Sequence, residues 1–343
     1  MSEGLREIAV VSYAGLPVVG AGADPAIMVQ AVVSRVLEDS GLDRSQLGFV
    51  CSGSRDYDFG QPFAFVSALD GVGAWPPVAE SHVEMDGAWA LYEAWVKLLT
   101  GDIDAALVYA FGCASRGDLD AVQTLELNPY TLAPLGVRPA GLAALQARSL
   151  IDAGRYTEAD FARVAARGTD QSADELLRAP YVASPLRAHD RAPRTDGAVA
   201  VLLAAGDLAR ELCERPAWIR GMDHRIEVHS PGFRDLTRAP SIAEAGRRAR
   251  GERPQPDLAE LHAPWSHQAF LIRDALALED GTAINPSGRV LAREIPMAAG
   301  LQRIGEAAAR LSRGDADTAL AHATMGPCLQ QNLVCYLSAE EEI

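Results

Sequence analysis

Three side chains that can exchange protons lie close together in the stretch ESHVEMDGAWALYEAW: His82, Glu84 and Asp86. Alternate residues of a strand point to one face, so the three could act together. A helical pattern starts at Gly87, and enzymes often hold a nucleophile where a strand turns directly into a helix. This junction carries carboxylates instead of Cys or Ser. A carboxylate at such a position could act as a general base.

Two other interpretations of this junction stay open. Asp86 directly precedes the helix and fits the role of a helix cap. Glu84 could occupy a polar pocket near the helix N-terminus, where an anion is stabilised by about 0.3–1 kcal/mol. The third possibility is metal binding by His82, Glu84 and Asp86, although no second cluster of ligands supports it.

Other polar candidates are scattered along the chain. Tyr57, in the stretch SRDYDFG, could reach a substrate hydroxyl or a partner subunit. His267 opens a helical pattern and could cap the helix, face solvent or contact a ligand. His322 lies on an apolar strand-like run, where a structural role is an equal alternative. Cys113 is expected to be a small buried thiol.

Composition limits the class of protein. The 343 residues are enough for one large or two modest domains, and the net charge of -15 disfavours nucleic acid and anionic membranes as partners. The five cysteines are widely spread and lack metal-ligand spacing, as expected for free thiols in a reducing cytoplasm. The N-terminal stretch reads as a first strand rather than a signal peptide, and no segment is apolar enough to span a membrane.

Strand-like and helical patterns alternate, which predicts an α/β fold. The predicted strands are 8–14, 47–53, 78–83, 106–112, 198–204, 258–264, 318–324 and 332–337. The predicted helices are 25–41, 87–101, 157–168, 266–278 and 298–314.

One unit occurs twice. GDIDAALVYAFG begins at Gly101 and GDADTALAHATMG begins at Gly314, and each follows a helical pattern and opens a strand. Two copies of a helix–turn–strand unit indicate two similar halves packed as one pseudo-symmetric body. The long segment between them, about 113–195, begins with turn formers and continues into helices. A connection of this length often covers a functional site.

Several motifs now resemble those of the thiolase superfamily, in particular the sterol-carrier-protein-type thiolases called lipid-transfer proteins. They are SPLRAHDRAPRTDGAVAVLLA (184–204), ELHAPWSHQAFLIRDALAL (260–278), AINPSGRVLA (283–292) and ALAHATMGPCLQQN (319–332). The stretch from 51 to 95 is similar to a short branch linked to steroid side-chain degradation. The resemblance covers about residues 6–338.

The resemblance implies a fold and a domain arrangement. Duplicated βαβαβαββ halves are expected to pack as a five-layered α-β-α-β-α body. The N-terminal half is expected to span 1–205, including the insertion at about 113–195, and the C-terminal half 206–343. The family's ligand is a coenzyme A thioester, so Asn285, Ser287, Gly288, Gly326 and His267 are candidates for contact with it, with an ordinary turn an equal alternative at Ser287 and Gly288.

The chain departs from the family at its reactive positions. Glu84 stands where thiolases carry the nucleophilic Cys, and the Gly-His-Pro motif is matched by Glu294, Ile295 and Pro296, so its His is lost. Cys328 lies three residues beyond the family's second Cys. His262 matches a retained element that would hydrogen-bond the thioester carbonyl. Thiolysis needs a thiolate and a base, so an acyl-Cys intermediate is not expected.

Two functions therefore remain. The first is retro-aldol cleavage of an acyl-CoA in steroid side-chain degradation, with Glu84 as base, His262 as donor, and His82, Asp86 and Tyr57 as further candidates. The second is a non-catalytic or half-catalytic subunit that stabilises a partner thiolase or aldolase. The resemblance implies as partners a homologous thiolase-like chain and a small OB-fold/zinc-ribbon protein. Coenzyme A enters as part of the substrate, and no bound cofactor or metal is expected.

Overall fold

The computed structural model describes residues 6–18, 22–60, 62–73, 75–288, 290–291 and 293–340. Its ten-stranded sheet has the order β10-β9-β11-β12-β8-β1-β7-β4-β2-β3. The first half contributes β1 (Ile8–Val18), β2 (Phe49–Gly53), β3 (Glu80–Val83), β4 (Ala105–Gly112) and β7 (Asp196–Ala205). The second contributes β8 (Ala217–Ile226), β9 (Leu258–Leu261), β10 (Ala283–Ile284), β11 (Thr318–Met325) and β12 (Gln331–Ser338).

The two halves repeat one topology and meet where β1 pairs with β8. Only two residue pairs, Ala9 with Trp218 and Val10 with Ala217, join them there. Within each half the strands occupy equivalent places, so β2 corresponds to β9, β4 to β11 and β7 to β12. The boundary between residues 205 and 206 stays a prediction.

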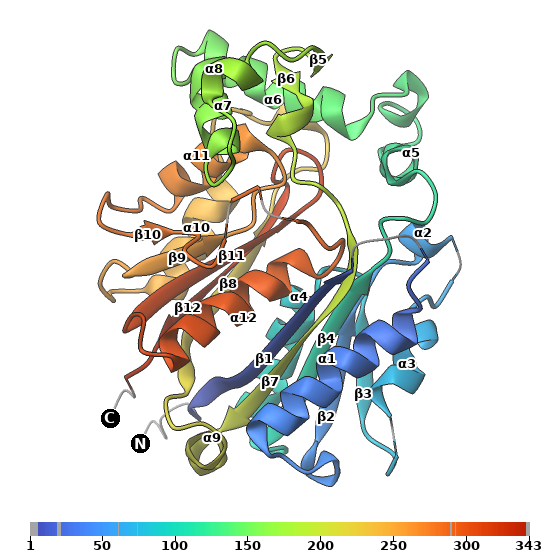
Figure 1. Ribbon diagram of the computed structural model, residues 1–343, viewed down its shortest axis with the longest axis vertical. Coiled ribbons are helices and arrows are strands. Elements are labelled where there is room, and N and C mark those ends of the chain that lie inside the picture. Colours follow the sequence, from blue (N-terminus) through green and yellow to red (C-terminus); the bar gives the residue numbers. More distant parts are fainter. Residues whose placement is uncertain are drawn as a thin grey trace.

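Helices form three layers around the sheet (Figure 1). The central helices α4 (Gly87–Leu99) and α12 (Ala299–Ser312) share a core with strands of both halves. On the outer face of the first half lie α1 (Pro25–Ser40) and α3 (Val66–Val72), and α10 (Pro240–Arg250) and α11 (Ser266–Ala275) cover the second. The predicted five-layered α-β-α-β-α arrangement is confirmed.

The predicted duplication is visible at the turns after the two central helices. Gly101 follows α4 and has φ 83°, and Gly314 follows α12 and has φ 78°. This left-handed conformation is favourable for Gly and ends both helices in the same way. β4 and β11 then begin at equivalent positions of the two halves.

The pattern of apolar residues did not predict β8 and α10. β8 carries Arg220, Asp223, His224 and Arg225 beyond its first three residues, so it has no long apolar run. α10 carries a narrow apolar stripe on an otherwise charged helix. The predicted strand at 258–264 ends at Leu261, which places His262 on the loop beyond it.

The insertion packs on the second half (Figure 1). It contains α5 (Leu119–Leu125), α6 (Pro139–Asp152), α7 (Glu158–Ala166), α8 (Ala173–Leu176) and the small strands β5 (Tyr181–Ala183) and β6 (Leu186–Arg187). Phe161 of α7 contacts Phe270 of α11, with ring centroids 6.3 Å apart. The remaining helices are α2 (Asp56–Phe59) and α9 (Gly206–Leu212). None of the described helices is long and apolar enough to cross a membrane.

Candidate functional site

A cavity of about 360 Å³ lies where the central helices, the loop after β11 and the insertion meet. Its volume falls within the range of small-molecule sites. Its lining combines an apolar side with a charged one. The charged and polar residues are Arg55, Glu84, Asp86, Gln123, Glu126, Arg194, His229, His262, Gln268, Glu294, Thr324, Gln330 and Gln331.

Asp86 joins the N-termini of both central helices. Its carboxylate accepts hydrogen bonds from Ala88 N at 2.9 Å in α4, and from Gly300 N and Leu301 N at 3.0 Å each in α12. The predicted cap is therefore present and also serves the second half. Burial raises the pKa of Asp86, while nearby His262 and the three backbone donors oppose the rise.

Glu84 lies at the cavity edge with its side chain 47% exposed. Its Oε1 accepts from Asp56 N at 2.5 Å, and its Oε2 lies 3.1 Å from His82 Nε2. Among the described residues His82 does not line the cavity, and its ring stacks on Phe65 at 4.4 Å between centroids.

His262 borders the cavity from the loop after β9 and is almost wholly buried. Thr324 N donates to its Nδ1 at 3.5 Å, which leaves the proton of a neutral ring on Nε2. Within the described chain Nε2 has no hydrogen-bond partner, and Glu294 Oε1 lies 3.7 Å away. His262 is thus a buried donor whose nearest acceptor, Glu294, lies beyond ordinary hydrogen-bond length.

Glu294 faces the cavity at the lost Gly-His-Pro motif. Ile295, which aligns with the missing His, is 1% exposed and packs in the main core. Burial alone would raise the pKa of Glu294, but His262, Arg194 and Arg191 together outweigh it and lower the pKa. Glu294, the residue before Ile295, therefore supplies the polar group at this position. The comparison of motifs did not assign it that role.

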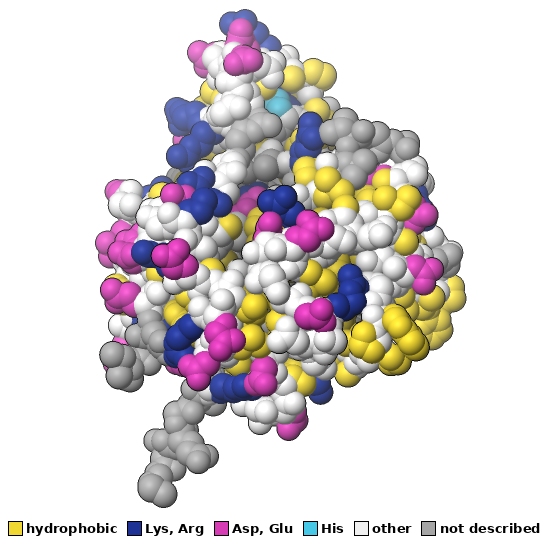
Figure 2. Space-filling model, turned by 60° about the horizontal axis from the view of Figure 1, so that its bottom comes forward, with side chains coloured by type: hydrophobic (Ala, Val, Ile, Leu, Met, Phe, Trp, Pro, Cys, Tyr) yellow, Lys and Arg dark blue, Asp and Glu magenta, His cyan; other side chains and the backbone are white. Residues whose placement is uncertain are grey.

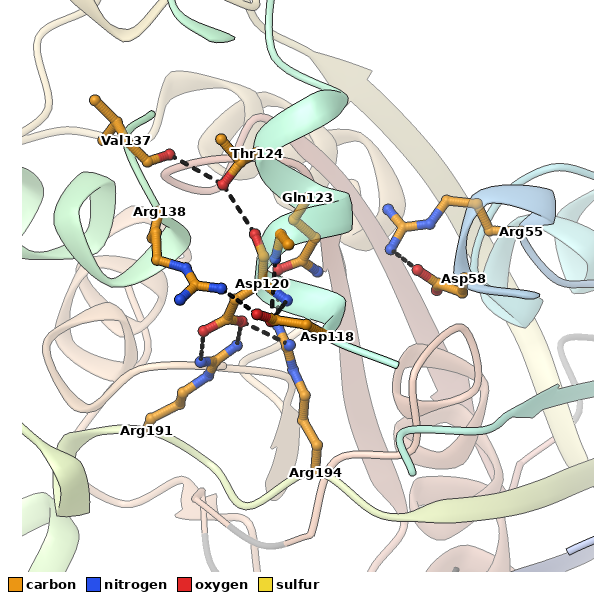
Figure 3. Close-up of polar contacts among 11 residues, drawn as sticks. Arg55, Asp58, Asp118, Asp120, Gln123, Thr124, Val137, Arg138, Arg191 and Arg194 are labelled. Atoms are coloured by element: carbon orange, nitrogen blue, oxygen red, sulfur yellow. Dashed lines mark hydrogen bonds and ion pairs between the residues drawn. The ribbon is translucent and has the colours of Figure 1, made fainter. Parts of the chain in front are cut away.

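The insertion closes the cavity through α5, which ion pairs attach to the segment that leads into β7 (Figure 3). Asp120 accepts from Arg191 Nη2 at 2.7 Å and from Arg194 Nη1 at 2.9 Å. Beyond α5, Glu126 accepts from Arg55 Nη1 at 2.9 Å. Burial raises the pKa of Glu126, although the Arg55 guanidinium opposes it. These contacts hold α5 as a wall of the cavity.

Besides His82, five predicted residues lie outside the cavity lining. Tyr57 is 60% exposed on α2. Asn285 is buried and pairs through its amide with both backbone groups of Leu261. Gly288 and Ser287 form an exposed turn in which Ser287 N donates to Glu260 at 2.9 Å. His267 is fully buried, and its Nε2 lies 3.1 Å from Gln146 Oε1.

Of the predicted ligand-binding set, only Gly326 lines the cavity, with φ 75°. His322 is buried and bonded to Asn332 Oδ1 at 3.1 Å, as the structural alternative expects. The side chains of His82, Glu84 and Asp86 do not form one cluster, because Asp86 accepts its hydrogen bonds from the two helix N-termini. Within the described chain no group of three or more His, Cys, Asp or Glu side chains could hold a metal ion.

Comparison with known proteins identifies the architecture. No family model matches the sequence. Over 168 residues, 42% of the chain, it is 32% identical to the acetyl-CoA acetyltransferase of Methanothermobacter thermautotrophicus, and the match spans only 43% of that relative's length. The solved Ltp2-ChsH2(DUF35) aldolase superposes with TM-score 0.79 at 18% identity, covering 98% of both chains. Human mitochondrial 3-ketoacyl-CoA thiolase in complex with CoA superposes with TM-score 0.77 at 14% identity, also covering 98% of both.

The chain has the thiolase fold. Its cysteines, however, are not prepared for thiolase chemistry. Cys328 lines the cavity, but burial raises its pKa to about 12, and burial likewise raises the pKa of Cys113 to about 11. A thiolate is the reactive form of cysteine, and these environments disfavour it.

Sequence reasoning missed the part of the cavity that the insertion supplies. Gln123, Glu126 and Arg194 line it, and Arg55, from outside the insertion, pairs with Glu126 there. Arg194 lies within the motif at 184–204, but the motif did not mark it as a cavity residue. The length of the insertion was the only signal that pointed to this wall.

Proposed function

We propose that the protein cleaves a carbon–carbon bond of a β-hydroxyacyl-CoA by a retro-aldol reaction. The observation that carries this proposal is His262, a buried donor with no acceptor within ordinary hydrogen-bond length in the described chain, beside a cavity lined by Glu84, Glu126 and Glu294. Retro-aldol cleavage needs a base and a donor for the thioester oxygen, and it needs no covalent nucleophile.

The reaction balances without an oxidant or a reductant. Glu84 takes the proton of the β-hydroxyl, and the C–O bond becomes a carbonyl as the bond between the α and β carbons breaks. The released electron pair forms the thioester enolate, whose oxygen accepts a hydrogen bond from His262 Nε2. Return of the proton to the α carbon gives a shorter acyl-CoA and a ketone or aldehyde.

The coenzyme A part of the substrate is supported by likeness. A solved thiolase with this fold holds CoA, and a curated relative is an acetyl-CoA acetyltransferase. The proposal that the acyl group is a steroid rests on the resemblance to lipid-transfer proteins. The apolar side of the cavity, which includes Leu127, Leu142 and Trp265, is compatible with a hydrocarbon group. A cytoplasmic location remains a prediction from the free cysteines.

Assembly with other chains is part of the proposal. The similar Ltp2-ChsH2(DUF35) aldolase is named as a two-component protein, which supports a heteromer with a small OB-fold/zinc-ribbon partner. Pairing with a thiolase-like chain would use β3, an edge strand of the sheet. Nearby elements carry the exposed Phe63, Val66 and Trp75, and Figure 2 shows hydrophobic side chains gathered on the side of the molecule where these elements lie.

The test is incubation with β-hydroxyacyl-CoA thioesters, one of them with a steroid ring system as its β substituent, with and without candidate partner chains. The expected products are a shorter acyl-CoA and a carbonyl compound. Intact-mass spectrometry should show no acyl adduct on the protein. A stable adduct on Cys113 or Cys328 would contradict the proposal. Absence of cleavage by the assembled complex would favour the non-catalytic subunit, whose supporting observation is the structural use of Asp86 at both helix ends.

A further inference from the structure

A chain of side chains runs from the interior of the first half to the cavity. Ser52 of β2 is fully buried, and its Oγ lies 3.1 Å from Nδ1 of His82. The two residues are register partners on the parallel strands β2 and β3. His82 Nε2 in turn lies 3.1 Å from Oε2 of Glu84, which borders the cavity. Each link has hydrogen-bond length.

The chemistry of the two ends assigns the protons along this chain. An ionised carboxylate only accepts hydrogen bonds, so His82 Nε2 carries a proton and donates it to Glu84. In the neutral ring Nδ1 is then an acceptor, and the hydroxyl of Ser52 donates to it. Phe65 stacks on the ring at 4.4 Å with an interplanar angle of 14°, which restricts its rotation.

We propose that His82, fixed by Ser52 and Phe65, is the positioning residue of Glu84. This inference rests on the proposed function, in which Glu84 is the base. With Asp56 N on Oε1 and His82 on Oε2, both carboxylate oxygens have a donor and the plane of the carboxylate is set. A base held in this way keeps one orientation toward the β-hydroxyl, although its side chain is half exposed.

The same three residue types occur in Ser-His-acid hydrolases, in which Ser is the nucleophile. That function is disfavoured here because Ser52 has no exposed surface and lies on the far side of the ring from the cavity. The charged and titratable groups near this chain are Glu80 beside His82, Asp56 and Glu126 near Glu84, and Tyr109 near Ser52. None of them replaces the donor that His82 gives to Glu84.

The kinetic test uses the assembled protein and its β-hydroxyacyl-CoA. His82→Ala should lower kcat about 10²-fold with KM little changed, since misplacement of a reacting group by about 1 Å costs this much. His82→Gln keeps a donor near Glu84 and should restore most of kcat. Ser52→Ala should lower kcat less, whereas Ser54→Ala, at an equally buried serine whose hydroxyl has no hydrogen-bond partner among the described residues, should leave it unchanged. Wild-type kcat in His82→Ala, or no rescue by Gln, would overturn the inference.

Two further measurements separate this inference from the proposed function. If Glu84→Gln is inactive while His82→Ala is fully active, only the positioning role fails. If Glu84→Gln is fully active, the assignment of the base itself fails. Imidazole nitrogen NMR of the protein without substrate should show the proton of His82 on Nε2, and the opposite tautomer would contradict the chain. Labelling of Ser52 by a fluorophosphonate would also overturn it, because Ser52 would then be a nucleophile.

Discussion

Two walls of the cavity differ in how completely their polar atoms are hydrogen-bonded. On the body side, both oxygens of Glu84 have donors, and Asp86 accepts three backbone hydrogen bonds. On a second wall, around Glu126, Arg55 Nε and Glu126 Oε1 are buried without a hydrogen-bond partner among the described residues, and so is Oδ2 of Asp58, which pairs with Arg55 outside the cavity lining. The first wall is preorganised, and the second contains unused hydrogen-bonding capacity.

This difference separates two tasks. Groups that act on reacting atoms gain from being fixed before the substrate arrives. A buried polar atom without a partner costs free energy, about 1–3 kcal/mol, and a polar ligand or a water molecule can remove that cost. We therefore expect the body wall to carry the chemistry and the wall at Glu126 to contribute to binding.

The largest expected effect is that of Glu84→Gln. The amide keeps the shape of the side chain but cannot take a proton, so kcat should fall about 10²–10⁴-fold, the usual contribution of general acid–base catalysis. The measurement is steady-state cleavage by the assembled complex. Glu80→Gln, on the strand β3 that ends directly before Glu84 but outside the cavity lining, is the matched control and should keep full activity. Equal loss in both variants would indicate damage to β3 rather than loss of a base.

Removal of the donor should have the next largest effect. His262→Ala should lower kcat about 10²–10³-fold, because an oxyanion-hole donor contributes this much. His262→Gln retains an amide donor and should recover part of the rate. Thermal unfolding of both variants should stay close to wild type. A change in KM alone would place His262 in substrate binding instead.

The body wall can also be tested by stability. Asp86→Ala removes the cap of both central helices, and each cap is typically worth about 0.5–2 kcal/mol, so the free energy of unfolding should fall by about 1–4 kcal/mol. Asp24→Ala is the control, because Asp24 caps only α1 through Ala26 N at 2.9 Å. It should cost about 1 kcal/mol. Urea unfolding measures both, and equal losses would contradict the double cap.

The sequence predicted more of the wall at Glu84 and Asp86 than of the wall at Glu126. Gly87 after Asp86 is a local signal for a helix cap, and the duplicated turns at Gly101 and Gly314 revealed the two halves. The second helix that Asp86 caps lies more than two hundred residues away, and only the folded chain brings it there. Glu126 is joined to Arg55 by a contact across 71 residues, and neither residue carries a local signal for it.

Acidification should lower the free energy of unfolding through two buried histidines. His267 contacts Gln146 of the insertion, and His322 lies on β11; burial lowers the pKa of each to about 3. The unfolded chain binds protons near pH 6.5, so stability is present above that pH and is lost as pH falls toward 3. Each histidine contributes a slope of up to about 1.4 kcal/mol per pH unit in this window. Urea midpoints between pH 7 and 4 measure the slope, and His267→Gln should reduce it.

The smallest effect is expected at the wall that contains Glu126. Glu126→Gln keeps the size of the side chain but removes its charge, and the contact with Arg55 weakens. If this wall binds substrate and does not touch the reacting atoms, ground state and transition state lose the same interaction. KM should then rise about tenfold, the equivalent of about 1.4 kcal/mol, while kcat stays near wild type. The controls are Gln123→Glu, which alters charge on the same wall, and calorimetric binding of the thioester to the Glu84→Gln protein. A fall in kcat as large as that of Glu84→Gln would make Glu126 part of the chemistry, and the contrast between the two walls would not hold.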